Sequence, residues 1–129
     1  MERSSPFPHG ASGCEWVVEA HGCDPVRLRD CAVLAELFRR LEADLNLHVL
    51  SESWHQFPDS GGVTGLALLA ESHLAVHTFP EFCSLCLNVF CCRPRPDWDF
   101  AQHLENMFAA AEVVTRKIER PYQAGVLTA

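Results

Sequence analysis

At residues 70–81 the chain reads Ala70-Glu71-Ser72-His73-Leu74-Ala75-Val76-His77-Thr78-Phe79-Pro80-Glu81. This stretch places a serine, two imidazoles and two carboxylates within an otherwise apolar, strand-forming run. Burying an unpaired polar group costs about 1–3 kcal/mol, so a purely structural strand would carry Val, Ile or Leu at these positions. The density of polar groups therefore indicates that this strand supports chemistry.

Further strands are predicted on both sides of this stretch. Residues 65–70 and 74–79 form one long β-compatible run that we expect to be broken or bent near residues 71–73. The loop signal Pro-Asp-Ser-Gly-Gly at residues 58–62 separates this run from the strand before it. The other predicted strands cover residues 14–20, 47–54, 85–92 and 113–118.

Two helices are predicted between the strands. Asp24 and Pro25 form a helix start, and apolar residues then recur every three or four positions up to Leu45, which predicts a helix from about Pro25 to Asn46. Asp97 begins a second apolar-faced helix near residues 100–111. The order βαβββαβ predicts an α+β fold, a two-layer sandwich in which both helices cover one face of a largely antiparallel sheet.

The composition narrows the class of protein. With 129 residues, 48% of them hydrophobic, the chain fits a loose tail over residues 1–12 and one domain over residues 13–129. We expect a cytoplasmic protein, because no run is apolar enough for a membrane span and the start does not resemble a signal peptide. The net charge of −7 disfavours nucleic acid as a partner and favours a cationic small molecule.

Seven cysteines leave open a second class of function, a non-enzymatic, thiol-rich metal-binding or regulatory domain. Cys83 and Cys86 have a zinc-like spacing, with Cys91, Cys92, His73 and His77 nearby. The Cys83-x-x-Cys86 run leads straight into an apolar strand instead of a tight turn, so no metal site is expected. The single lysine, Lys117, makes a pyridoxal phosphate Schiff base a poor hypothesis.

Four stretches lie in a fixed order along the chain: residues 54–57 (Trp-His-Gln-Phe), 62–65 (Gly-Val-Thr-Gly), 71–81, and 89–92 (Val-Phe-Cys-Cys). They resemble the aromatic-His-x-Phe, Gly-Val-Ser-Gly, self-processing and Phe-Thr-Cys-Gly motifs of the bacterial and archaeal S-adenosylmethionine decarboxylases. The predicted order of strands and helices agrees with that family from about residue 13 to residue 120. The chain is thus identified as resembling a pyruvoyl-dependent decarboxylase.

The resemblance implies a self-cleaving proenzyme. The Ser72 hydroxyl would attack the Glu71 carbonyl, and β-elimination from the resulting ester would cut the chain into residues 1–71 and 72–129. Hydrolysis of the dehydroalanine left at residue 72 would then give a pyruvoyl group derived from Ser72 at the start of the second chain. His77 would be the base in that elimination, a role that an imidazole can fill near neutral pH. Thr64 would supply a processing hydroxyl. In turnover the pyruvoyl carbonyl would form a Schiff base with the substrate amine, and Cys92 would be the general acid.

The resemblance also implies the substrate and the assembly. The substrate would be S-adenosylmethionine, decarboxylated for spermidine and other polyamines, with Phe57 and Phe79 beside the adenine and sulfonium and Glu81 on the ribose hydroxyls. The enzyme would be a homodimer of cleaved protomers with sites near the subunit interface.

Several positions depart from the family pattern, and these departures leave open a basic amino acid as an alternative substrate. Thr64 stands where a serine is usual, Phe79 where a tryptophan is usual, and Asn88 where an aspartate is usual. Cys91 and Arg93 replace a threonine and a glycine, and the loop at residues 58–62 is one residue longer. Because these changes surround the substrate, L-ornithine or L-arginine remains an alternative substrate for the same mechanism.

Overall fold

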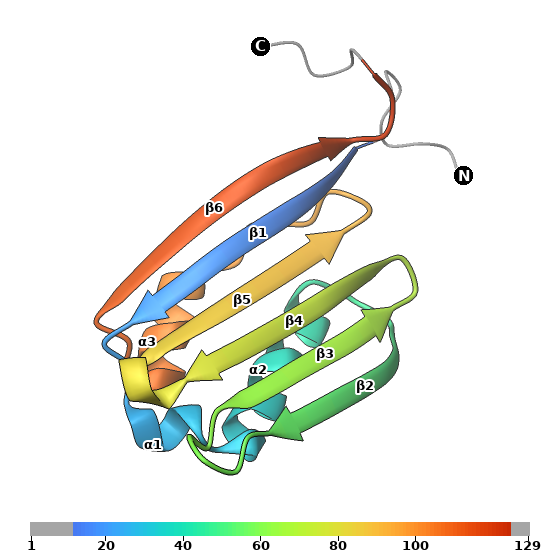
Figure 1. The fold of residues 1–129 in the computed structure, drawn as a ribbon. Coiled ribbons are helices and arrows are strands. Elements are labelled where there is room, and N and C mark those ends of the chain that lie inside the picture. Colours follow the sequence, from blue (N-terminus) through green and yellow to red (C-terminus); the bar gives the residue numbers. More distant parts are fainter. Residues whose placement is uncertain (1–11, 125–129) are drawn as a thin grey trace.

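The computed structural model describes residues 12–124 and contains one six-stranded antiparallel sheet (Figure 1). The spatial order of the strands is β2-β3-β4-β5-β1-β6. The tail expected over residues 1–12 lies outside the described residues except for Ser12, which begins the first strand. The strands are β1 (Ser12–His21), β2 (Val49–Gln56), β3 (Val63–Leu69), β4 (Ser72–Phe79), β5 (Ser84–Cys91) and β6 (Glu112–Pro121).

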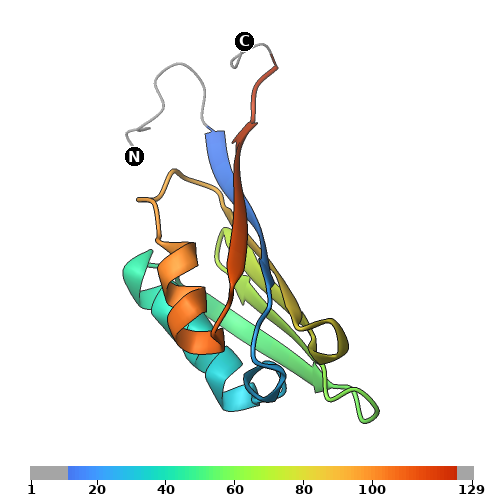
Figure 2. The same cartoon turned by 90° about the vertical axis from the view of Figure 1, so that its left-hand side faces the viewer.

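The helices α1 (Pro25–Leu28), α2 (Cys31–Asp44) and α3 (Phe100–Phe108) all cover the same face of the sheet (Figure 2). The helix expected over residues 25–46 is therefore two helices. Asp30 interrupts it, because its backbone is extended and its side chain accepts a hydrogen bond from the Ala32 amide at 2.9 Å, which starts a new helix. In the part of the chain that the structure describes, no helix is long and apolar enough to cross a membrane.

The long run expected as one interrupted strand is a hairpin. The strands β3 and β4 pair antiparallel, with Thr64 opposite His77 and Leu68 opposite His73. The chain reverses at Ala70 and Glu71, where the sequence predicts only a break or bend. The sheet consequently has six strands instead of five, while the predicted two-layer α+β architecture is confirmed.

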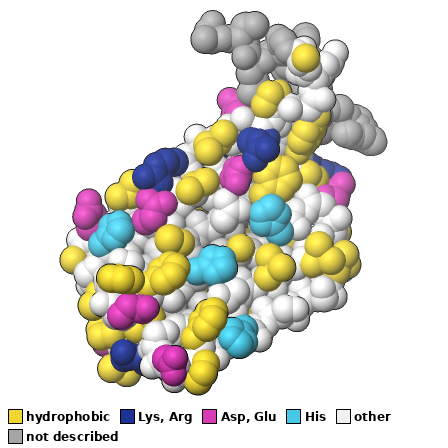
Figure 3. Space-filling model, in the orientation of Figure 1, with side chains coloured by type: hydrophobic (Ala, Val, Ile, Leu, Met, Phe, Trp, Pro, Cys, Tyr) yellow, Lys and Arg dark blue, Asp and Glu magenta, His cyan; other side chains and the backbone are white. Residues whose placement is uncertain are grey.

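The core lies between the sheet and the helices, because the strands alternate buried and exposed side chains. Within residues 12–124, no helix covers the other face of the sheet, which we call the open face (Figure 3). Leu66 and Leu68 of β3 and Ile118 of β6 remain about half exposed there. The inner face buries Trp16, Val18, Leu74, Val76, Leu87 and Val89 against Leu34, Phe38, Leu41, Leu104 and Phe108.

The two halves of the chain are interleaved in the sheet. The strands β1, β2 and β3 precede the turn at residues 70–71, and β4, β5 and β6 follow it. In space, however, β1 lies between β5 and β6 and pairs with both of them along most of its length (Figure 1). Each half therefore provides strands that complete the sheet of the other.

A buried hydroxyl joins the sheet to the first helix. Thr78 Oγ1 accepts a hydrogen bond from the Val63 amide and donates one to the Leu28 carbonyl, both at 2.8 Å. We expect Thr78→Val to lower the free energy of unfolding by about 1–3 kcal/mol, because both backbone groups lose their partner. Urea denaturation measures this loss. The exposed Thr115→Val is the control, and equal stability of the two variants would contradict the expected role.

Two carboxylates face each other between α2 and β2. Burial raises the pKa of Glu42 above its ordinary 4.5, and the neighbouring Glu52 carboxylate raises it further. A pKa raised by folding means that stability is highest below pH 4.5 and falls as the pH rises through the folded value. We therefore expect Glu42→Gln to raise the melting temperature at pH 7 but not at pH 4.

Glu36 on the same helix provides the control for this prediction. Hydrogen bonds from Arg40 and Arg39 lower the pKa of Glu36, so its charged form is the favoured one in the fold. Glu36→Gln should lower the melting temperature at pH 7, the opposite sign to Glu42→Gln. If both variants shifted the melting temperature in the same direction, the carboxylate pairing at Glu42 would not be the cause.

Candidate functional site

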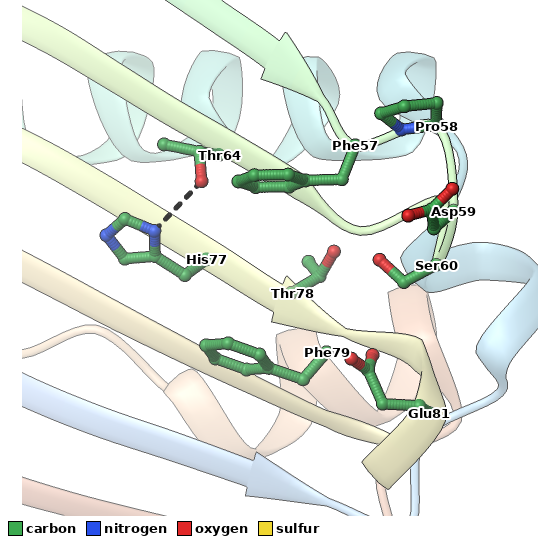
Figure 4. A pocket seen from close by; sticks show the side chains of 9 residues that line it. All are labelled: Phe57, Pro58, Asp59, Ser60, Thr64, His77, Thr78, Phe79 and Glu81. Carbon is green, nitrogen blue, oxygen red and sulfur yellow. Dashed lines mark hydrogen bonds between the residues drawn. The ribbon is translucent and has the colours of Figure 1, made fainter.

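A pocket of about 540 Å³ opens where the ends of β2 and β4 meet the loop at residues 57–62 (Figure 4). Its size lies within the range of small-molecule sites in proteins. Five of the residues predicted for the site line it: Phe57, Thr64, His77, Phe79 and Glu81. Sequence reasoning missed the other four, which are Pro58, Asp59, Ser60 and Thr78.

Thr64 and His77, the two residues of this pocket that are predicted to act in processing, are hydrogen-bonded to each other. Thr64 and His77 are direct partners in the register of β3 and β4, and Thr64 Oγ1 lies 3.1 Å from His77 Nδ1. This contact orients the imidazole. The glycine that follows is required by packing, because a Cβ at Gly65 would collide with the ring of Trp54 on the neighbouring strand.

Two aromatic rings border the pocket on opposite sides, and both remain partly exposed (Figure 4). Phe57 follows β2 and Phe79 ends β4. His55 supports the first ring edge-on, with the ring centroids 4.6 Å apart. A flat or cationic ligand group between these rings would gain stacking or cation–π contacts.

The loop that carries Asp59 and Ser60 is fixed by hydrogen bonds. The Phe57 amide donates to the Gly62 carbonyl, and the Gly61 amide donates back to Phe57. Arg29 Nε donates to the Ser60 carbonyl at 3.0 Å. Gly61 has a φ of +77°, which only glycine adopts at low cost. The sequence pattern predicts a loop here, but it holds no signal that the loop would form a wall of the pocket.

The remaining predicted residues, Glu71, Ser72 and Cys92, lie at the opposite end of the sheet (Figure 1). Ser72 opens β4, in register with Cys91 of β5. His77 lies five residues further along β4, which places its Cα about 16 Å from that of Ser72 at about 3.3 Å per residue. The strand alternation also directs the two side chains to opposite faces. Within one protomer, the predicted site thus falls into two clusters.

The Cys92 thiol is held in its protonated form. Burial raises its pKa above the ordinary 9.0, and a hydrogen bond with the Glu71 carboxylate raises it further. Glu71 also pairs with Arg93 at 3.3 Å. Tyr122, which no motif singled out, donates its hydroxyl to the Cys92 carbonyl at 2.6 Å. A neutral thiol of this kind is able to donate a proton.

The cysteine spacing does not assemble a metal centre in this structure. Cys83 is partly buried at the end of the short 3₁₀ helix η1 (Pro80–Phe82), whereas Cys86 is exposed on the sheet. Across residues 12–124, no group of three or more His, Cys, Asp or Glu side chains is placed to hold a metal ion. The burial of Cys14, Cys23 and Cys91 fits core packing.

The fold is an antiparallel sheet with helices on one face, and strand and loop side chains form a pocket at one end of the sheet. This pocket has the size and lining of a small-molecule site. The sequence comparisons identify the family of the protein. The chain belongs to the S-adenosylmethionine decarboxylase family, whose model matches residues 14–121. This membership supports a carboxy-lyase and disfavours the non-enzymatic thiol-rich alternative.

Individual relatives support the same assignment. The chain is 32% identical over 111 residues to the S-adenosylmethionine decarboxylase proenzyme of Moorella thermoacetica, covering 85% of this chain and 88% of that protein. It is 34% identical over 94 residues to the proenzyme of Pyrobaculum islandicum, covering 68% of this chain and 75% of that protein. The fold resembles the crystal structure of the adenosylmethionine decarboxylase from Aquifex aeolicus VF5, with a TM-score of 0.72, 21% identity, and coverage of 90% and 96% of the two chains.

Proposed function

We propose that this chain is the proenzyme of a pyruvoyl-dependent S-adenosylmethionine decarboxylase that serves polyamine, including spermidine, synthesis in the cytoplasm. The observation that carries this proposal is the pocket, which gathers the aromatic, acidic and imidazole side chains expected for that substrate. None of the nine described residues lining it is a lysine or arginine, so its formal charge with a neutral His77 is negative. This suits the sulfonium and ammonium groups of the substrate.

Self-cleavage would occur between Glu71 and Ser72. The Ser72 hydroxyl attacks the Glu71 carbonyl and converts the peptide bond into an ester, and loss of the Ser72 α-proton then expels the main-chain carboxylate of Glu71 and leaves dehydroalanine at residue 72. Water hydrolyses the imine form of this dehydroalanine to the pyruvoyl group and releases ammonia. The position of this bond supports the proposal, because it ends the two-residue hairpin turn between β3 and β4. Cutting there leaves the pairing of both strands intact. The pyruvoyl group left at residue 72 would supply the electron sink for decarboxylation.

The residues for processing and turnover would meet across a homodimer interface. About 16 Å separates Ser72 from His77 along β4, so one protomer cannot bring them together without breaking its sheet. A second copy packed on the open face with its strands reversed would set Thr64 and His77 of one protomer over the end of the sheet that carries Ser72 and Cys92 in the other. The half-exposed Leu66, Leu68 and Ile118 make the open face suitable for such a contact (Figure 3).

Release of carbon dioxide from carboxyl-labelled substrates tests the proposal. S-adenosylmethionine, L-ornithine and L-arginine are compared side by side, and we expect release from S-adenosylmethionine alone. Release from either amino acid instead would replace the substrate but keep the mechanism. An uncut chain that releases carbon dioxide from none of the three would refute the proposed function.

A further inference from the structure

The pocket holds a carboxylate that the family resemblance does not account for. Asp59 lies in the loop at residues 57–62 and lines the pocket, and none of the four motifs of the resemblance includes it. Its side chain stands on the same side of the pocket as those of Ser60 and Glu81, across from Thr64 and His77 (Figure 4). The two carboxylates therefore form one acidic end of the cavity.

The backbone of the loop that carries Asp59 is anchored, and the pocket lining supplies no positive charge to balance the two carboxylates. Gln56 Nε2 donates to the Arg29 carbonyl at 2.8 Å and to the Gly61 carbonyl at 3.1 Å, so the loop is tied to both the sheet and the helix layer. The Arg29 guanidinium donates hydrogen bonds to the Ser60 and Pro25 carbonyls and does not line the pocket. Asp59 and Glu81 are the two charged side chains among the described residues of the lining.

We propose that Asp59 is a specificity-determining residue, which selects sulfonium ligands over neutral thioethers of nearly the same shape. This inference rests on the proposed function and adds a discriminating residue to it. Because the anchored loop backbone keeps Asp59 at the pocket wall, its carboxylate is already close to a cation that enters, and the attraction between them adds to affinity. A neutral thioether stacks on the rings of Phe57 and Phe79 but gains neither their cation–π attraction nor that of the Asp59 carboxylate. The loss of sulfonium affinity in a charge-removing variant of Asp59 isolates the carboxylate's share.

Two ligands that differ by one methyl group and one charge test this inference. These are 5′-methylthioadenosine, a neutral thioether, and its S-methyl sulfonium derivative, both of which lack the aliphatic α-amino group that would form a Schiff base with a carbonyl. Calorimetric titration of the wild-type protein and Asp59→Asn gives both dissociation constants. We expect the variant to bind the sulfonium about three- to tenfold more weakly, the thioether less than about twofold more weakly, and the difference to shrink in high salt.

Two further variants separate charge from shape. Asp59→Glu keeps the carboxylate and should retain most of the selectivity for the sulfonium. Asp97→Asn removes an exposed carboxylate that pairs with Lys117 outside this pocket, and it should leave both affinities unchanged. An unchanged ratio of affinities in Asp59→Asn, or equal losses in Asp59→Asn and Asp59→Glu, would overturn the inference.

Decarboxylation measured on the same preparations distinguishes this failure from failure of the proposed function. If the wild-type protein decarboxylates S-adenosylmethionine while Asp59→Asn keeps the wild-type ratio of the two affinities, only the role of Asp59 is refuted. A wild-type protein that neither decarboxylates S-adenosylmethionine nor binds the sulfonium refutes the proposed function, and the role of Asp59 with it.

Discussion

Replacing Ser72 with alanine is expected to leave the chain in one piece and to abolish decarboxylation. Without the hydroxyl at residue 72, no ester with the Glu71 carbonyl forms and no pyruvoyl group is made. Intact-mass measurement should show a single chain of 14.4 kDa. The wild-type protein should instead give two fragments, residues 1–71 and 72–129, the second without a free amino group at its start.

The control for this experiment is Ser51→Ala, which removes an exposed serine hydroxyl from β2, far along the chain from the predicted cleavage bond. It should be cut and active like the wild type. If Ser72→Ala protein were cleaved, or decarboxylated its substrate at the wild-type rate, the pyruvoyl mechanism would be wrong for this chain.

A mixture of two inactive variants is expected to recover function. His77→Ala and Ser72→Ala would each lack one group that the proposed processing requires, and general-base catalysis is worth about 10²–10⁴ in rate. If the site combines Ser72 of one protomer with His77 of the other, a mixed dimer contains one intact site. Random pairing of co-expressed chains should then restore about a quarter of the wild-type activity, because about half of the dimers are mixed.

Different affinity tags on the His77→Ala and Ser72→Ala chains show which of the two chains is cut in the mixed dimer. In the mixed dimer the intact Ser72 belongs to the His77→Ala chain, so about half of those chains should be cut, while no Ser72→Ala chain is cut. Each variant expressed alone should stay whole. Should the His77→Ala chain remain uncut in the mixture, the two clusters would have to meet within one protomer, and the proposed interface would be incorrect.

The sequence predicts the fold well where hydrophobic periodicity decides it. Alternating apolar residues identify most strands to within a few residues, and the apolar stripe near Phe38 identifies the main helix. Two errors arise where one or two residues redirect the chain. Asp30 ends one helix and starts another, and Ala70 with Glu71 form a tight hairpin turn without the Gly or Asn that usually marks one.

The resemblance to the family predicts which residues belong to the site, but it does not predict how they are arranged in space. Five of the eight line one pocket, yet Glu71, Ser72 and Cys92 lie at the far end of the sheet. Spacing along a strand fixes distance and face only once the register and the turns are known, and these depend on the whole sheet. The same limit explains why the sequence predicts that Asp59 lies in a loop but does not predict that this loop forms a wall of the pocket.

The interleaving of the two halves has a consequence for the life of the protein after cleavage. Before the cut, unfolding and refolding involve one molecule. After the proposed cut, the two fragments would stay together in the folded protein, because β1 of the first fragment would lie between β5 and β6 of the second. Once unfolded, they would have to find each other again by diffusion, so recovery of the cut protein would become slower on dilution while that of uncut Ser72→Ala would not. Self-cleavage would thus make maturation a nearly one-way step, in which the active form is preserved by slow unfolding rather than by ready refolding.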